Sequence, residues 1–334
     1  MNKMLADFFS NPLNTDLLIL LLFIFSGFVQ LAFTVYLLYT PRGWRQVAIA
    51  VLFAIIIFNC QLLLAYSAFI EPYWLDKNQV EVSISKSGIE NETQRKMNIV
   101  LISDLHLGRY KNDNYLENLV REINAEKPDI VVIPGDFVLD RKENIRLAEP
   151  LSQLNTRYGV YATLGNHDYD LKYLGGLDFE QAETSEFEDY IANELESFGV
   201  RVLRNEGFFI EGLYLAGMED YWGNRGYFSE AFAALDNQNS QHPTVLLAHS
   251  PDFVDLEVAN RADLVLSGHT HAGQVNLPII GNIMPIPTYA GDKYVSGLYT
   301  EGEQKLYVTR GVGEVGARTR LLARPEITVI QLEY

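Results

Sequence analysis

Short apolar runs, each followed closely by histidine, aspartate or asparagine, are the feature that most constrains the fold of this chain. Four runs have the length and composition of buried strands: 99–102, 130–133, 244–247 and 264–266. The polar motifs that follow them are Ser103-Asp104-Leu105-His106, Gly135-Asp136, Ala248-His249 and Gly268-His269-Thr270-His271. Because open α/β sheets bind ligands at the carboxyl ends of their strands, the pattern predicts an α/β fold with one composite site.

A fifth motif, Gly165-Asn166-His167-Asp168, follows the strand-like residues 159–164, so five of the six histidines lie in such motifs. Histidine and carboxylate are the usual ligands of borderline divalent metals, and a hydrolytic centre with two metals needs about this many donors. A lone buried histidine is more often a core residue than a ligand. The ordered set of motifs instead favours a two-metal site, whereas the remaining histidine, His242, is expected in a solvated loop.

Charge and cysteine content narrow the functional class. The formal net charge is −17 and there is no dense run of lysine and arginine, so nucleic acid is not expected as the partner. The single cysteine, Cys60, lies in an apolar stretch, which excludes a disulfide framework and favours a passive role over a redox one.

Two long apolar segments near the amino terminus predict a membrane anchor. Residues 17–40 and 46–70 are 24 and 25 residues without a charge, and each exceeds the ~20 residues that cross a bilayer as a helix. A cleaved signal peptide would have a shorter apolar core and no second span. The aromatic residues at the ends of these segments fit interfacial belts: Tyr36, Tyr39, Trp44, Tyr66, Tyr73 and Trp74.

A hairpin of two spans places the amino terminus and the downstream domain on the same side of a cytoplasmic or inner membrane. The connection between the spans carries Arg42 and Arg45, whereas the amino-terminal tail has Lys3 beside two aspartates. The positive-inside rule therefore favours a cytoplasmic connection and an extracytoplasmic domain. Lys77 and Lys86, which follow the second span, favour the opposite orientation.

The chain divides into an anchor over residues 1–75, a lead-in segment over 76–97 and a domain over 98–334. Alternating Val80, Val82 and Ile84 predict an edge strand in the lead-in segment. Apolar spacing and breakers predict helices over 112–127, 141–156, 185–198 and 252–261. Strands are predicted over 159–164, 306–309 and 327–332, with a hairpin over 208–218 that turns at Glu211-Gly212. For residues 170–186, a loop over the site and a surface insertion remain alternatives.

In order along the chain, the motifs Asp-x-His, Gly-Asp, Gly-Asn-His-Asp, Ala-His and Gly-His-x-His resemble those of the calcineurin-like metallophosphoesterase superfamily, over about residues 98–334. The tail resembles the bacterial membrane-associated branch in two stretches, 308–313 and 323–327. The resemblance implies an α/β fold, a four-layer α/β/β/α metallophosphoesterase sandwich preceded here by two transmembrane helices. It also implies two metals held by loops at one edge of the paired sheets.

The resemblance implies two sets of three metal ligands: Asp104, His106 and His271 for one ion, and Asn166, His249 and His269 for the other. Asp136 would bridge the two ions, and a hydroxide shared by them would attack phosphorus. His167 would stabilise or protonate the leaving-group oxygen. A mixed set without thiolate favours Mn²⁺, with Fe, Zn or Mg as alternatives. Asp168 is expected to cap the following turn.

These features together predict a membrane-anchored phosphodiesterase or pyrophosphatase that acts on a phosphorylated lipid, a cell-envelope precursor or a small molecule. Serine/threonine phosphatases of the superfamily carry arginine where this chain has Leu164, and the Asp140-Arg141 pair is displaced by one residue, so a protein phosphatase is disfavoured. One alternative is the UDP-2,3-diacylglucosamine pyrophosphatase of lipid A synthesis, whose substrate is cytoplasmic. Another is a non-catalytic, membrane-tethered metal-binding scaffold, although no ligand is missing.

Four arginines are candidates for contact with a substrate phosphate: Arg109, Arg310, Arg318 and Arg320. Surface solvation is the favoured interpretation for three of them, and Arg310, at a strand end, is the stronger candidate for a phosphate contact. The sequence leaves the oligomeric state open.

Overall fold

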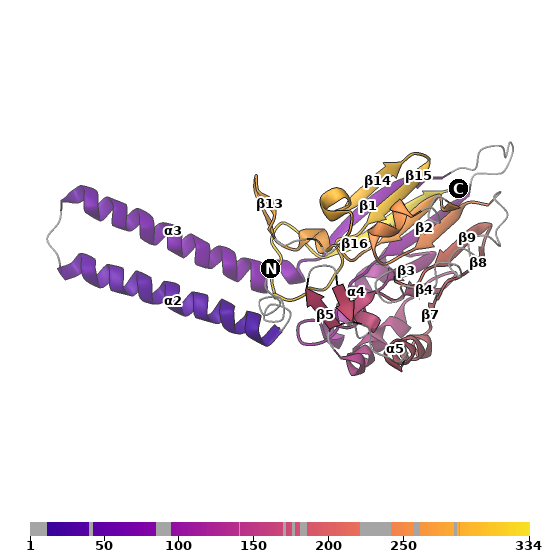
Figure 1. The fold of residues 1–334 in the computed structure, drawn as a ribbon, viewed down its shortest axis with the longest axis horizontal. Coiled ribbons are helices and arrows are strands. Elements are labelled where there is room, and N and C mark those ends of the chain that lie inside the picture. The colour runs from indigo at the N-terminus through magenta and orange to yellow at the C-terminus, as the bar shows by residue number, and fades with distance from the viewer. Residues whose placement is uncertain are drawn as a thin grey trace.

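Two long helices lead into an α/β domain in the computed structural model of the chain (Figure 1). The structure describes residues 12–39, 43–84, 95–139, 141–169, 172–175, 178–180, 186–220, 242–256, 261–283, 286 and 288–334.

The helices α2 (Pro12–Tyr39) and α3 (Trp44–Phe69) lie side by side and meet the length and composition criteria for membrane spans. They contact each other through the rings of Phe33 and Phe53, whose centroids are 5.8 Å apart, and through a hydrogen bond of 3.3 Å from the Gln30 side chain to the Ala54 carbonyl. Most of their leucine, isoleucine and phenylalanine side chains are exposed. A bilayer would cover such a surface. The prediction is therefore confirmed in one respect: both segments form helices that are long and apolar enough to span a membrane.

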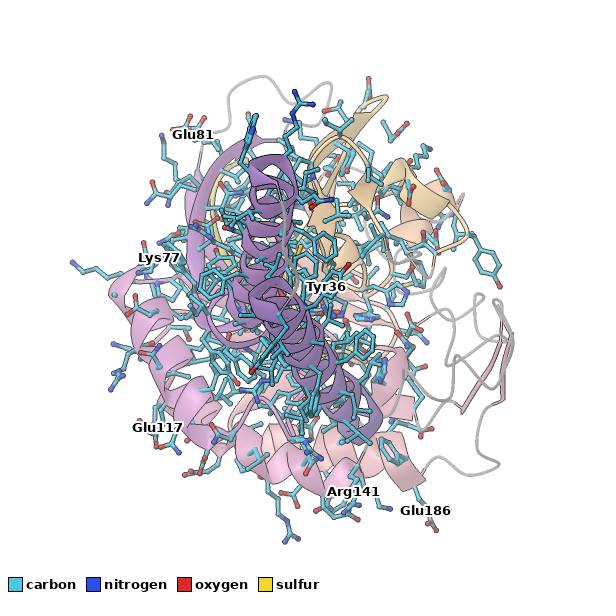
Figure 2. All side chains as sticks on the ribbon, turned by 90° about the vertical axis from the view of Figure 1, so that its left-hand side faces the viewer. Tyr36, Lys77, Glu81, Glu117, Arg141 and Glu186 are labelled. Carbon is cyan, nitrogen blue, oxygen red and sulfur yellow. The ribbon has the colours of Figure 1, made fainter. Side chains whose placement is uncertain are left out.

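The anchor joins the domain through the short 3-10 helix η1 (Glu71–Tyr73). The backbone N–H of Arg320 donates to the Ser67 carbonyl at the end of α3 (2.8 Å), and Asp16 at the start of α2 pairs with Arg109 (3.2 Å). Viewed along the anchor, the two helices stand in front of the domain, with charged residues such as Lys77 and Glu117 at its periphery (Figure 2). The beginning of α2 and the end of α3 therefore lie at the same side of the domain.

The first sheet has the order β1-β16-β2-β3-β4-β7. Its strands are β1 (Asp76–Ser83), β2 (Lys96–Leu101), β3 (Ile130–Pro134), β4 (Val160–Thr163), β7 (Val200–Val202) and β16 (Glu326–Glu333). The strands β2, β3, β4 and β7 are parallel, whereas β16 is antiparallel to β2 and parallel to β1. The predicted edge strand of the lead-in segment is confirmed, and its eight residues pair with the last strand of the chain.

The second sheet has the order β14-β15-β11-β10-β9-β8. Its strands are β8 (Glu206–Ile210), β9 (Leu213–Gly217), β10 (Thr244–Leu247), β11 (Leu264–Ser267), β14 (Gly297–Glu301) and β15 (Gln304–Val308). The predicted hairpin is confirmed as β8 and β9, with Glu211 and Gly212 at φ of 50° and 87° in its two-residue turn. Positive φ at both turn residues matches the right-handed twist of the strands.

The two sheets pack face to face through a core that includes Ile99, Val132 and Leu332 from the first and Val245 and Leu266 from the second. The other face of the first sheet packs against α4 (Asp113–Ala125), the 3-10 helix η2 (Lys142–Gln153) and α5 (Glu186–Ser197). On the outer face of the second sheet, the described residues contribute the short 3-10 helix η4 (Pro251–Asp255). These layers form the predicted mixed α/β sandwich.

Local signals predicted some helices closely and others less well. The side chain of Asn112 accepts a hydrogen bond from the Tyr115 N–H (3.1 Å) and caps α4 as expected. The predicted helix over 141–156 is a 3-10 helix with Pro150 inside it, because proline lacks the N–H that an α-helical bond needs. The predicted helix over 252–261 is shorter: η4 ends at Asp255, and residues 257–260 lie outside the described residues.

The segment 170–186 contains a small hairpin of β5 (Lys172–Gly175) and β6 (Asp178–Glu180). Its remaining residues up to 185 lie outside the described residues, so neither expectation for this segment is tested.

Candidate metal centre

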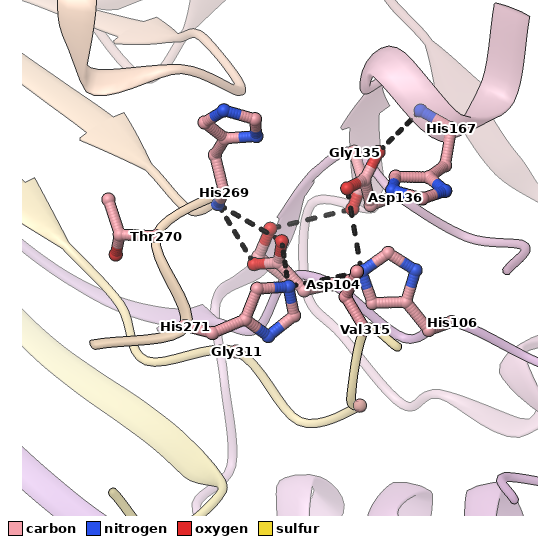
Figure 3. Close-up of polar contacts among 12 residues, drawn as sticks. Asp104, His106, Gly135, Asp136, His167, His269, Thr270, His271, Gly311 and Val315 are labelled. Carbon is pink, nitrogen blue, oxygen red and sulfur yellow. Dashed lines mark hydrogen bonds and ion pairs between the residues drawn. The ribbon is translucent and has the colours of Figure 1, made fainter. Parts of the chain in front are cut away.

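All five polar motifs meet at one edge of the paired sheets. Figure 3 labels residues from four of them. The first three motifs follow the parallel strands β2, β3 and β4, and the other two follow β10 and β11 of the facing sheet. Parallel neighbours end at the same edge, so the loops after them converge. The eight residues named from the sequence therefore lie together, although their motifs span residues 104–271.

The first group of ligand atoms belongs to Asp104, His106 and His271, and these atoms lie within 4.8 Å of one another. The Nε2 atoms of His106 and His271 are 3.1 Å apart, and Nε2 of His271 is 3.5 Å from Oδ1 of Asp104. All three side chains are buried. Such a set of two imidazoles and a carboxylate can hold one divalent cation.

The second group belongs to Asp136, His249 and His269, again within 4.8 Å of one another. Nε2 of His249 is 3.1 Å from Oδ2 of Asp136 and 3.2 Å from Nδ1 of His269. Oδ1 of Asn166 lies 3.1 Å from the same Nε2 atom. Oδ2 of Asp136 is also 3.5 Å from Nε2 of His106, so this carboxylate lies between the two groups.

The hydrogen bonds of His249 indicate whether the second group of ligand atoms could bind a cation. Its Nδ1 lies 2.7 Å from the Pro134 carbonyl oxygen, which can only accept, so Nδ1 carries the proton and donates. In the neutral ring, Nε2 then directs a lone pair at the carboxylate of Asp136 and the amide oxygen of Asn166. Electron-rich atoms that face one another at this distance repel unless a proton or a metal ion lies between them. The donors of this chain therefore fit the divalent ions that the motifs predict.

Burial and charge set the protonation states of these groups. Burial lowers the pKa of His106 to about 3, which keeps its imidazole neutral and available as a ligand. Burial would lower the pKa of His249, but the Asp136 carboxylate outweighs it and raises the pKa to about 10, so without a metal a second proton is held on Nε2, facing Asp136. A divalent ion bound there would replace that proton. The surrounding histidines, His249 first, overcome burial and hold the pKa of Asp136 well below its usual value. Negative charge is thus concentrated on Asp136, and the positions around it favour a cation.

The ligand loops adopt a backbone conformation that side chains rarely favour. Five of the eight residues have positive φ: Asp104 (55°), His106 (43°), Asp136 (59°), His269 (70°) and His271 (49°). Each such residue costs on the order of 1–3 kcal/mol and persists where surrounding structure holds it. This clustering is typical of functional sites, and it turns the side chains sharply out of their strands toward one another.

Two motif positions must be glycine because a ligand carboxylate lies close to the Cα atom of each. A Cβ atom on Gly165 would lie 2.3 Å from Oδ1 of Asp136, and one on Gly268 would lie 2.4 Å from Oδ2 of Asp104. Real Cβ atoms are not found at such distances, so any larger residue would displace the ligand carboxylates. The glycines were counted in the motifs, but their contacts with the carboxylates could not be read from the sequence.

His167 stands at the edge of the centre and is partly exposed, unlike the buried ligands. Its Nδ1 is 3.0 Å from the Leu139 carbonyl and donates to it, while its backbone N–H donates to Oδ1 of Asp136 (2.9 Å). A ring nitrogen also lies within 4.8 Å of ligand atoms of His106 and Asp136. The geometry therefore suits a proton donor at the mouth of the site and also lies within reach of a metal.

Among the described residues, Asp168 contacts other groups than the turn that was expected, and residues 170 and 171, which follow it, lie outside the described residues. Its buried carboxylate accepts from the backbone N–H groups of Asp136 (2.9 Å), Phe137 (2.9 Å) and Gly165 (3.0 Å). It thus ties together the loops that carry Asp136 and Asn166. Burial, with the charge of Asp136, raises the pKa of Asp168 to about 7 against these hydrogen bonds. The carboxylate acts as a positioning residue for Asp136.

Asp168→Asn is expected to lower metal affinity and activity by about 10- to 100-fold, the usual scale for residues that orient ligands. The amide would direct N–H groups at backbone N–H groups and loosen the loop of Asp136. Metal titration by calorimetry and initial rates measure the effect. Asp252→Asn is a matched control, because Asp252 accepts from Tyr289 and Ala290 N–H groups (2.9 Å each) in a different loop. Equal effects of both variants would contradict the positioning role.

Of the four arginines, Arg109 is exposed as expected, whereas Arg310 and Arg320 differ from the predictions. Arg310 does not face the site: its guanidinium pairs with Glu326 (2.8 Å) and Asp76 (2.7 Å) and joins β16 to β1. Arg320 is buried rather than solvated, and it donates to the carbonyls of Arg310 (3.0 Å) and Gly313 (2.5 Å), with Nη2 3.4 Å from Nδ1 of His271. Asp76 is 234 residues from Arg310, and the carbonyls that Arg320 binds are brought together by the folded loop after β15, so the sequence pattern did not assign these partners.

The other two arginines join the domain to the anchor. Arg318 lies over the ring of Phe69 at 4.9 Å, and Arg109 pairs with Asp16. His242 is half-buried, with its ring 4.8 Å from that of Phe209, so it is less solvated than expected and lies outside the metal centre.

Comparisons with known proteins place these features among metallophosphoesterases. Residues 97–273 match the family model of the calcineurin-like phosphoesterases. The chain is 31% identical over 72% of its length to an uncharacterised metallophosphoesterase of Campylobacter jejuni, of which it spans 60%. It is 29% identical to Phosphodiesterase YaeI of Escherichia coli, over 80% of this chain and 92% of that protein. A zebrafish (Danio rerio) transmembrane protein with metallophosphoesterase domain is 33% identical, over 76% of this chain and 56% of that protein.

Proposed function

Because this chain belongs to the calcineurin-like phosphoesterase family, whose members use divalent metal ions, we propose that it is a membrane-anchored hydrolase of phosphodiester or pyrophosphate bonds with a dinuclear metal centre. The observation that carries the proposal is the position of Asp136 between two ligand groups. The proposed ligands are Asp104, His106, Asp136, Asn166, His249, His269 and His271. Mn²⁺ is the proposed ion, because the donors are histidine, carboxylate and amide oxygen without thiolate.

Two divalent cations at such a centre would polarise the phosphoryl oxygens and lower the pKa of a shared water. The side chains of the protein supply charge, hold the ligands in position and stabilise the leaving group. Asp136 supplies the negative charge between the two positions, and its conformation is held by Asp168 and by the His167 N–H. His167 is partly exposed, and one of its ring nitrogens lies within 4.8 Å of ligand atoms of His106 and Asp136, so it is suited to stabilise or protonate a leaving oxygen.

The proposed substrate is a phosphorylated lipid or cell-envelope molecule. The two apolar helices and the similarity to a protein named for its transmembrane character support membrane association. A substrate held at the membrane would be presented directly to a domain that is tethered beside it. The similarity to a protein named phosphodiesterase favours a diester over a monoester. UDP-2,3-diacylglucosamine pyrophosphatase activity is the second candidate, and a non-catalytic scaffold is the third.

We place the domain on the extracytoplasmic side of the inner or cytoplasmic membrane, because Arg42 and Arg45 follow the first span. A reporter fused after Tyr334 tests this side: alkaline phosphatase is expected to be active and green fluorescent protein dark. The reverse pattern would overturn the placement and favour a cytoplasmic substrate such as UDP-2,3-diacylglucosamine.

The purified full-length protein is expected to bind about two divalent cations and to hydrolyse bis(p-nitrophenyl) phosphate with Mn²⁺. Chelation with EDTA should abolish the activity, and Mn²⁺ should restore it. His249→Ala should remove activity, whereas His242→Ala is the matched control, because this histidine lies outside the centre. A folded, metal-loaded protein that is inactive on diesters, monoesters and pyrophosphates would support the scaffold alternative.

A further inference from the structure

A small hairpin between the metal centre and the anchor exposes an apolar tip. It consists of β12 (Asn276–Leu277) and β13 (Gly281–Asn282), joined by Pro278-Ile279-Ile280. Ile279 is fully exposed, Ile280 is 72% exposed and Ile283, just after the hairpin, is 54% exposed. Three exposed isoleucines in five residues form an apolar surface that water does not favour.

The backbone of this tip is also strained. Ile279 has φ of 73°, a left-handed conformation that a β-branched residue rarely adopts. Strain of this kind persists where a function maintains it. A loop that merely connected two strands in water would be better served by glycine or asparagine at this position. Both the residue type and its conformation therefore point to a role for the exposed side chain.

The hairpin lies beside the end of the second anchor helix. Arg320 N–H donates to the Ser67 carbonyl of α3, and the next residue, Leu321, exchanges backbone hydrogen bonds with Gln274 (3.0 Å) and Asn276 (2.8 Å) at the base of the hairpin. A single extended segment thus separates α3 from the hairpin. Figure 1 shows the hairpin on the side of the domain from which the two helices emerge.

The residues around the end of α3 also have the composition of a membrane interface. Phe69 and Ile70 at the end of α3 are half exposed, and Leu322, beside the segment that contacts α3, is 61% exposed. Trp74 lies immediately after η1 with the guanidinium of Arg324 3.7 Å from its ring centroid. Tryptophan stacked with a cation at the end of an apolar helix is typical of the headgroup region. The base of the hairpin is bonded to the same segment through Leu321.

The hairpin differs from the rest of the domain in its charge content. The chain has a net charge of −17, yet the twenty residues from Ala272 to Gly291 contain no charged side chain. An acidic domain is repelled by anionic lipid headgroups, so attraction of opposite charges cannot hold it against the bilayer. Apolar side chains at a neutral tip can make such a contact.

We propose that the β12–β13 hairpin is a second membrane contact, which inserts Ile279 and Ile280 into the lipid interface beside α3. The contact would also orient the metal centre. His271 begins the turn that leads into the hairpin, and the Gln274 side chain holds the carbonyls of Val315 (3.1 Å) and Ala317 (3.0 Å) in the neighbouring loop. A hairpin seated in the interface would therefore fix the mouth of the centre close to the headgroups.

Site-directed fluorescence in nanodiscs tests the contact without reference to activity. Cys60 is the only cysteine, so Cys60→Ser gives a background in which Ile280→Cys can be labelled with the environment-sensitive dye NBD. The emission should shift to the blue and be quenched by lipids with a nitroxide near the headgroup. High salt should not reverse the effect, because the contact is apolar. Phe209→Cys, at a 52% exposed apolar residue on the distant strand β8, is the matched control and should remain water-like.

Equal emission and quenching at the two positions would overturn the proposal and would leave the tip free for another partner. A second measurement rests on the proposed function. The Ile279→Ser/Ile280→Ser variant should lose about tenfold in kcat/KM on a phosphodiester held in the bilayer and stay within about twofold on bis(p-nitrophenyl) phosphate. If the unmodified protein is inactive on both substrates, the proposed function fails, while the fluorescence result still decides the membrane contact.

Discussion

Asp136→Asn is expected to abolish phosphodiester hydrolysis and to reduce the metal content at both positions. The Asp136 carboxylate lies 3.1 Å from Nε2 of His249 and 3.5 Å from Nε2 of His106, so its charge serves both ligand groups. Asparagine keeps the shape of the side chain and tolerates the φ of 59° at this position, so the change removes charge rather than backbone structure. A loss of about 10³-fold or more is expected, as for removal of a principal electrostatic group.

The measurement combines initial rates with metal content by plasma mass spectrometry, at fixed free Mn²⁺. His271→Ala is the comparison, because His271 belongs to one ligand group and should empty mainly one position. If Asp136→Asn retains two ions and near-normal turnover, the bridging role is wrong. If both variants lose the same share of metal, Asp136 serves a single position.

His167→Ala is expected to lower the rate by about 10²- to 10⁴-fold, the scale of a general acid, with the metal content unchanged. The ring of His167 is held by its hydrogen bond of 3.0 Å to the Leu139 carbonyl and lies at the partly exposed side of the centre. The backbone N–H that contacts Asp136 is retained in the variant. The substitution therefore removes the imidazole without removing a contact of the bridging carboxylate.

The leaving group decides which role the imidazole has. A proton donor matters little for p-nitrophenolate and greatly for an alkyl or sugar alkoxide, so the loss should be small for the first and large for the second. An equal loss for both classes would indicate that His167 stabilises the phosphoryl oxygens instead. Since a ring nitrogen lies within 4.8 Å of ligand atoms of His106 and Asp136, loss of metal in the variant would identify His167 as a ligand.

Elements with local signals could be predicted well. The hairpin of β8 and β9 turns at Glu211-Gly212 as expected, and Asn112 caps α4, because a turn or cap depends on a few neighbouring residues. The helix over 141–156 was predicted as a helix but not as a 3-10 helix. Apolar spacing does not distinguish these two forms when a proline stands inside the segment.

Charged residues were the least predictable part of the chain. Arg310 was expected near a phosphate and instead joins Glu326 to Asp76, which is 234 residues away. Arg320 and Asp168 were placed in solvent and in a local turn, yet both are buried and hold loops of the metal centre. Asp168 accepts from the N–H groups of Asp136 and Phe137, 32 and 31 residues away, and Arg320 donates to carbonyls that the folded loop after β15 brings to it. A charge in a sequence does not indicate which groups the fold will bring to it.

The sequence by itself determined the α/β class, the segments that form the strands before the polar motifs and the convergence of those motifs. Each motif is attached to the end of its strand, and parallel strands bring their ends to one edge whatever lies between them. The resemblance implied a position for Asp136 between two ligand groups, but only the tertiary structure gave its distances to His106 and His249 and the positive φ of five site residues. It also decided that the apolar hairpin lies beside the anchor. These depend on contacts between residues far apart in sequence, and packing, not local preference, holds the backbone there against its strain.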